Sequence, residues 1–259
     1  MKFKLAAAVF VLLIAILSFV NSVPSRAQSK TGVARDSLSS TERDLLTEIN
    51  QARANPQLYA SYLEKLKPLF KGKEYDRPGH DPLVTEEGWS AVEDAIKFLK
   101  LARPLPALKL SQGLYLAAAA HVKDQSGTGN TGHKGSDSTF IEQRVKPFGT
   151  WQGGIGENLA YGEDSARERI LTWLIDDGFP SRGHRRRLLS GEYKVAGISC
   201  GPHPQFTSMC VLTFAGGFTD LSSTSSTKGG GTNSTTTKTP SPKAKNANVK
   251  NPSVKNRKM

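Results

Sequence analysis

Three short segments, Gly132-His133-Lys134-Gly135-Ser136-Asp137, Gly156-Glu157-Asn158-Leu159 and Gly183-His184-Arg185, each place a histidine or a glutamate beside a glycine. Glycine permits tight turns and close approach of the backbone, so we expect His133, Glu157 and His184 at the mouths of turns. Two imidazoles and one carboxylate are the ligand set of an open zinc site, and they can equally act as general acids and bases. A third interpretation is that they only hold loops together by hydrogen bonds.

Amphipathic helices are expected around these segments. Apolar residues recur at helical spacing, and Ser, Thr or Asp residues that can cap a helix precede several of the runs. For the first helix two caps compete, Thr41 with Asp44 and Ser39 with Glu42. Ser165 with Glu168 forms a third capping box. The helices are predicted over residues 41–54, 57–66, 86–102, 111–124 and from 166 onward.

Residues 67–85 and 149–156 are rich in turn formers, so the sequence predicts loops there. His80 and His203 each lie beside Gly or Pro, and both are predicted to be surface residues of turns. His121 falls on the apolar face of its helix and is expected to point inward as a structural residue. In the run of Arg185, Arg186 and Arg187 we expect a solvated turn with one arginine paired to a carboxylate; an anion-binding rim is the alternative.

Two strands near the C-terminus contain both cysteines. An even number of cysteines in an exported protein indicates a disulfide. If Cys200 lies opposite Cys210, then Ile198 faces Leu212, and all of these side chains share one face of the hairpin. A metal-binding cysteine pair would require closer spacing or further ligands. The chain-entropy estimate for so short a loop is about 2–3 kcal/mol of stabilisation.

Both ends of the chain differ in composition from its middle. Residues 1–27 combine Lys2 and Lys4, an apolar run and a small-residue site ending at Ala27, as expected for a signal peptide. The tail, residues 219–259, is rich in Ser, Thr and Lys, and such a composition cannot bury a core. Both ends are basic, and residues 28–220 carry only +1 of the formal charge of +12. A nucleic-acid-binding domain would concentrate positive charge on its folded face, so we expect no nucleic-acid partner.

The order of the motifs GHKGSD, GENLAYG, SRGHRRRLL and VAGISCG resembles that of the CAP superfamily, which comprises cysteine-rich secretory proteins, antigen 5 and pathogenesis-related proteins. The resemblance extends over residues 41–218, is strongest to the bacterial secreted branch, and leaves residues 28–40 as a linker. It implies an α+β fold, a three-layer α-β-α sandwich with a small antiparallel sheet. It also implies a central cavity lined by two histidines and two acids, which matches His133, Glu157 and His184 by motif.

The second acid of the family is usually a glutamate after the helix that begins near residue 166. Here the segment reads Ile175-Asp176-Asp177-Gly178. Helical periodicity places Asp177 on the buried stripe, four residues after Trp173, and leaves Asp176 off it. Asp177 is therefore the predicted fourth cavity residue. A helix-terminal acid bonded to a nearby arginine is the alternative.

The resemblance implies a secreted or envelope-associated protein whose cleft binds an extracellular ligand, which is a lipid, a glycan or a protein. His133, His184 and Glu157 would be the ligands of zinc or another divalent cation. The alternative is a hydrolase in which the same three residues are catalytic, although Ser136 and Ser138 lack the context of a nucleophile elbow. The basic tail would contact an anionic cell envelope or remain solvated.

Overall fold

The computed structural model describes residues 37–221. The predicted signal peptide and most of the predicted linker and tail lie outside the described residues. The helices are α1 (Ser40–Ala54), α2 (Pro56–Glu64), α3 (Trp89–Leu101), α4 (Gln112–Thr128), α5 (Ile141–Arg144), α6 (Ala166–Ile175) and α7 (Gly183–Leu188). The strands are β1 (Phe70–Lys71), β2 (Glu74–Tyr75), β3 (Leu83–Val84), β4 (Lys109–Leu110), β5 (Gly149–Tyr161), β6 (Val195–His203) and β7 (Thr207–Asp220).

The main sheet has four strands in the order β4-β6-β7-β5. Strands β5, β6 and β7 are antiparallel, while the short β4 pairs with β6 in parallel, so the sheet is mixed. The second sheet, β1-β2-β3, is antiparallel and lies in the segment that was predicted to be a loop. The fold class is α+β, as the resemblance implied.

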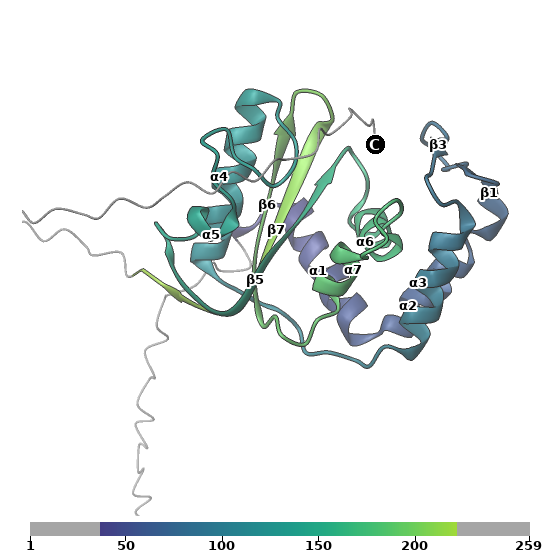
Figure 1. Cartoon of the computed structure of the whole chain (residues 1–259), viewed down its shortest axis with the longest axis horizontal. Coiled ribbons are helices and arrows are strands. Elements are labelled where there is room, and N and C mark those ends of the chain that lie inside the picture. Colours follow the sequence, from purple (N-terminus) through teal and green to yellow (C-terminus); the bar gives the residue numbers. More distant parts are fainter. Residues whose placement is uncertain (1–36, 222–259) are drawn as a thin grey trace, which may run out of the picture. The chain divides into compact units, whose positions relative to one another are not determined.

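Helices cover both faces of the main sheet (Figure 1). On one face, α4 and α5 pack with residues of β5 and β7 in two smaller apolar clusters. On the other, α1 and α6 pack against β6 and β7 in the largest cluster, which α2 and α3 extend. Burial of apolar surface on both faces of one sheet is what stabilises such a layered domain.

Helix starts follow from local capping. Ser39 and Glu42 form a reciprocal capping box at the start of α1, and Ser165 and Glu168 do the same for α6. The structure thus selects Ser39 over Thr41 as the first cap. A buried Leu38 precedes it, so the folded domain begins a few residues before the predicted boundary at residue 41. No helix in the described part is long and apolar enough to span a membrane.

The strand β5 corrects the predicted loop at residues 149–156. It runs through the glycine-rich segment and pairs with β7, with an irregularity between Gln152 and Ile155. Gly153 lies there with φ +69°, a conformation that favours glycine. Pairing with β5 also extends β7 to Asp220, so residues 219–220 belong to the domain and not to the tail.

The β6–β7 hairpin confirms the predicted register. Cys200 pairs with Cys210 and Ile198 with Leu212. The two sulfurs form a disulfide, with the Cα atoms 4.1 Å apart. His203, at the turn of this hairpin, was predicted to be exposed, but only 2% of its surface is accessible. The prediction was wrong because the β5 residue Tyr161 and Phe206 pack their rings against the imidazole.

Candidate functional site

Glu157 lies on β5, which is an edge strand of the main sheet. Its side chain is buried, and both carboxylate oxygens have partners. His133 Nδ1 donates to Oε1 at 3.0 Å, and Arg144 Nη2 donates to Oε2 at 2.6 Å. Arg144 also donates to the carbonyl of His133 at 2.9 Å. Glu157 therefore holds the histidine directly and is itself held by an arginine of α5.

The pKa of Glu157 lies below its ordinary value. Burial alone would raise it, but the bond from His133, the charges of Arg144 and His121 and the bond from Arg144 together outweigh burial. The carboxylate is ionised at neutral pH, so the His133 Nδ1–H is fixed as a donor to an anion.

A second histidine–carboxylate pair is formed by His184 and Asp176. Asp176 is 2% exposed. His184 Nδ1 donates to its Oδ1 at 2.7 Å, and the backbone N–H of His184 donates to Oδ2 at 2.8 Å. One aspartate thus fixes both the ring and the backbone of the histidine at the start of α7.

The predicted fourth residue, Asp177, has a different position. Its oxygens accept the backbone N–H groups of Glu86 and Glu87 at 2.6 and 2.9 Å, in the segment before α3. Helix α6 ends at Ile175, and Asp176 adopts the left-handed conformation with φ 58°. Helical periodicity stops at that point, so the stripe that predicted Asp177 does not extend to it. Asp176 is the acid that contacts His184.

The two histidine–carboxylate pairs flank the same short part of β5. Asn158 follows Glu157, and its Nδ2 donates to the His184 carbonyl at 3.2 Å. Within residues 37–221, neither His133 Nε2 nor His184 Nε2 has a hydrogen-bond partner. The His133 side chain is 42% exposed and that of His184 is 20% exposed. Each pair therefore presents one unpaired ring nitrogen.

The predicted metal ligands do not form one ligand set in this arrangement. Both oxygens of Glu157 are already engaged by His133 and Arg144. Among the described residues, the one group of three or more His, Cys, Asp or Glu side chains whose ligand atoms all lie within 4.8 Å comprises His80, Asp164 and Glu168.

The loop that carries His133 is pinned by residues that sequence patterns had not linked to it. His121 Nε2 and Gln125 Nε2 donate to the carbonyl of Gly132 at 2.9 and 2.6 Å, and the Tyr161 hydroxyl accepts the Gly132 N–H at 2.8 Å. Burial lowers the pKa of His121. The inward orientation predicted for His121 is confirmed.

One more residue holds this loop. His203 Nε2 donates to the carbonyl of Asn130 at 3.0 Å. The signal that could have revealed its role is position, because His203 lies in the turn of β6–β7, beside the end of β5. That proximity follows from strand pairing and not from the local sequence.

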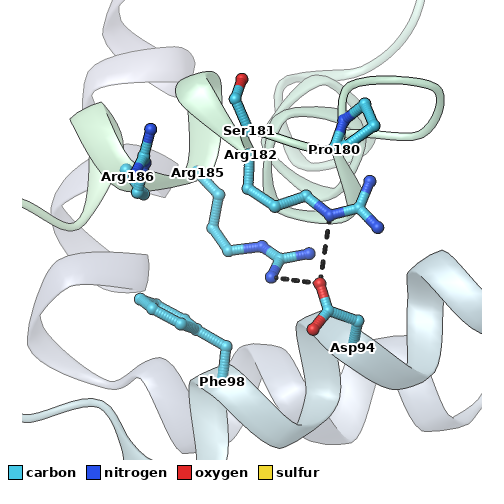
Figure 2. A pocket seen from close by; sticks show the side chains of 7 residues that line it. All are labelled: Asp94, Phe98, Pro180, Ser181, Arg182, Arg185 and Arg186. Atoms are coloured by element: carbon cyan, nitrogen blue, oxygen red, sulfur yellow. Dashed lines mark hydrogen bonds and ion pairs between the residues drawn. The ribbon is translucent and has the colours of Figure 1, made fainter.

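Arg185 and Arg186 of the arginine run line a separate pocket of about 390 Å³, together with residues of α3 and of the segment joining α6 to α7 (Figure 2). Arg185 Nη1 and Arg182 Nε donate to Asp94 at 2.9 and 3.1 Å, and Arg182 also makes two bonds to Glu87. The expectation that an arginine of this run pairs with a carboxylate is confirmed for Arg185. The predicted solvated turn is wrong, because the run forms α7 and Arg185 is buried. None of His133, Glu157 and His184 lines this pocket.

Residues 46–214 match the model of the cysteine-rich secretory protein family, CAP. The chain belongs to that family. Comparison with curated proteins gave no match.

Three solved structures are similar to the chain. One is an extracellular protein containing an SCP domain from Bacillus anthracis, at 23% identity and a TM-score of 0.35, over 43% of this chain and 34% of that one. The second is an outer surface protein from Borrelia burgdorferi, at 20% identity and a TM-score of 0.36, over 49% of this chain and 88% of that one. The third is a cysteine-rich secretory protein from Staphylococcus aureus, at 19% identity and a TM-score of 0.34, over 49% of this chain and 37% of that one. The chain thus spans only about a third of the Bacillus and Staphylococcus proteins.

Proposed function

We propose that the chain is an exported CAP-domain protein that binds an extracellular or envelope ligand through its two histidine–carboxylate pairs. The observation that carries this proposal is the arrangement of the rings. A buried carboxylate engages Nδ1 of each histidine and leaves Nε2 available. A ring fixed in one tautomer presents a directed hydrogen-bonding atom at little entropic cost.

Binding is favoured over hydrolysis because no hydroxyl of the GHKGSD loop is paired with a histidine. Ser136 Oγ donates to Asp124, as does its backbone N–H, so this serine is held by a carboxylate on α4. A hydroxyl without a positioned base is a weak nucleophile. The ligand would instead form hydrogen bonds with the imidazole rings of His133 and His184. We propose that it is a lipid, a glycan or a protein.

A hydrolase remains the second candidate, and one observation favours it. A carboxylate that holds Nδ1 of a histidine is the arrangement that orients a general base in other enzymes. In that case Glu157 would support His133 as the base that activates water, with no covalent step on a serine.

The test is co-sedimentation of the full chain with purified peptidoglycan and, separately, with vesicles of equal phosphatidylglycerol and phosphatidylcholine. We expect wild type to sediment with one of them, and the double variant His133→Ala/His184→Ala to lose at least roughly tenfold in affinity, because each ring would form a directed hydrogen bond. Asp177→Asn is the matched control, since it changes a nearby acid that contacts neither ring.

Measurements at 0.15 and 0.5 M NaCl separate this interaction from a purely electrostatic contact of the basic tail, which salt screens. Equal sedimentation of wild type and the double variant would refute the binding proposal. Release of soluble products from peptidoglycan or casein, lost in Glu157→Ala, would establish the hydrolase instead.

A further inference from the structure

A turn between β2 and β3 lies against the start of α6. Arg77, Pro78, Gly79 and His80 form the turn, in which the His80 N–H donates to the Arg77 carbonyl at 3.0 Å and Gly79 has φ +84°. Proline at the second position and a glycine with positive φ at the third define a type II turn. The turn therefore presents the side chains of Arg77 and His80 together.

Two carboxylates face this turn from the other side. Arg77 donates to Asp164 Oδ1 at 3.2 Å, which anchors the turn. Glu168 uses Oε2 to accept the Ser165 N–H at 2.8 Å in the capping box of α6. Its other oxygen, Oε1, faces His80 Nε2. Each carboxylate has one oxygen committed to structure, which leaves the other available.

The distance between His80 Nε2 and Glu168 Oε1 is 3.8 Å. That separation is too long for a hydrogen bond. It is shorter than the sum of one Zn–N and one Zn–O bond, about 4.1 Å, so one ion between the two atoms can contact both. Ligand atoms of Asp164, His80 and Glu168 all lie within 4.8 Å of one another.

Charge and exposure at these three residues suit a cation. Asp164 and Glu168 are acidic side chains, and each supplies a carboxylate oxygen to the group. The His80 and Glu168 side chains are 32% and 45% exposed, so an ion can reach them from solvent. An imidazole among the donors favours zinc and similar transition metals over calcium or magnesium.

The geometry points to a zinc-type metal site formed by His80, Asp164 and Glu168, which would clamp the β2–β3 turn to the start of α6. Three protein ligands leave a coordination position for water or a ligand. This site is separate from His133 and His184, and it does not depend on the proposed binding function. The simpler alternative is that two charge pairs, Arg77 with Asp164 and His80 with Glu168, dock the turn without a metal.

Isothermal titration of the full, untagged chain with ZnCl₂ at pH 7.5 tests the site. We expect one ion to bind at this site, and His80→Ala and Glu168→Gln each to weaken that binding at least roughly tenfold, since each removes one of three ligands. Glu168→Gln is the sharper variant because glutamine can still complete the capping box. The tail from residue 221 onward contains no His, Cys, Asp or Glu that would compete.

The control is His133→Ala/His184→Ala, which we expect to retain this binding. Zinc should also raise the melting temperature of wild type and of this control, but not that of His80→Ala. The proposal is overturned if wild type binds no zinc, if His80→Ala and Glu168→Gln bind as tightly as wild type, or if only the His133/His184 variant loses binding. Should Glu168→Gln fail to fold, Asp164→Asn replaces it, because asparagine retains an acceptor for Arg77.

Discussion

At the scale of single residues, Glu157 has the most constrained environment of the candidate site. It is an anion buried on an edge strand, with one oxygen bonded to a ring and the other to a guanidinium. A buried charge is tolerated only when it is paired and hydrogen-bonded, and removal of one partner from such a pair is costly. Glu157 therefore stabilises the fold while it fixes the tautomer of His133.

The first prediction concerns Glu157 and pH. Because its folded pKa lies below the ordinary value of 4.5, its contribution to stability is present above that ordinary value and is lost as pH falls through the folded pKa. We expect Glu157→Gln to lower the unfolding free energy at pH 7 by about 2 kcal/mol or more. The difference between the two proteins should begin to shrink below about pH 4.5 and should vanish only once the pH is below the folded pKa. Urea unfolding between pH 7 and pH 3 measures this, and a difference independent of pH would contradict it.

At the scale of elements, the end of α6 decides which aspartate serves His184. The Asp176 N–H bonds to the Thr172 carbonyl, and the left-handed residue then turns the chain so that its side chain reaches the start of α7. The next residue, Asp177, points to the segment before α3 instead. The conformation of Asp176 at the end of α6 therefore directs its own side chain to α7 and the side chain of Asp177 to the segment before α3.

The corresponding prediction compares Asp176→Asn with Asp177→Asn. Asparagine tolerates the left-handed conformation, so neither change strains the backbone. We expect Asp176→Asn to cost about 1–3 kcal/mol, because it weakens charge-assisted bonds to a buried group, and Asp177→Asn to cost about 1 kcal/mol or less. Urea midpoints give the two costs, and the NMR signals of the His184 ring should move only in Asp176→Asn. A larger cost for Asp177→Asn would argue against this assignment.

At the scale of the whole domain, Arg53 connects segments that are far apart in the sequence. It is 1% exposed. Its guanidinium donates to the carbonyls of Pro106, Leu188, Ser190 and Tyr193 at 2.8–3.1 Å. In the part of the chain that the structure describes it has no carboxylate partner, and burial lowers its pKa. This one side chain on α1 therefore organises the approach to β4 and the link from α7 to β6.

The prediction is that Arg53→Met destabilises the domain by about 3–5 kcal/mol. Methionine fills much of the volume but removes the donors to four carbonyls, of which the bonds to Leu188 and Tyr193 are buried. Arg53→Lys should recover only part of the loss, because an ammonium group lacks the planar fork of a guanidinium. Arg43→Met on the same helix is the control. Within residues 37–221 the Arg43 side chain donates only to the Leu38 carbonyl, and the expected cost is below about 1 kcal/mol. Denaturant unfolding measures both losses, and equal losses of unfolding free energy for Arg53→Met and Arg43→Met would contradict this prediction.

Several features could be predicted because their causes are local. Capping boxes satisfy free backbone groups within one turn of a helix, so residue spacing predicts Ser165–Glu168 directly and Ser39–Glu42 as one of two candidate caps. The two cysteines predicted a disulfide, and period-two alternation then predicted that Ile198 faces Leu212, as the hairpin shows. The glycines predicted that His133, Glu157 and His184 lie at the mouths of turns, and for Glu157 this was wrong because it lies within β5. The order of these motifs along the chain indicated the family.

Other features depend on contacts between distant segments. Glycine-rich residues 149–156 form a strand only because β7 pairs with them. His203 is buried by rings from β5 and its own hairpin, and His80 meets Asp164 and Glu168 only when a turn docks on α6.

By itself, the sequence determined most helix starts and the register of the cysteine hairpin, because these rest on interactions among residues close in the chain or on strict strand alternation. The order of its histidine and glutamate motifs implied the α+β class through the resemblance to the family. Only the tertiary structure decided that Asp176 and not Asp177 holds His184, that Glu157 is shared between His133 and Arg144, and that Arg53 is satisfied by carbonyls alone. The reason is physical. Burial and hydrogen-bond partners at these positions come from segments whose approach depends on the packing of the whole domain, and no local pattern encodes that approach.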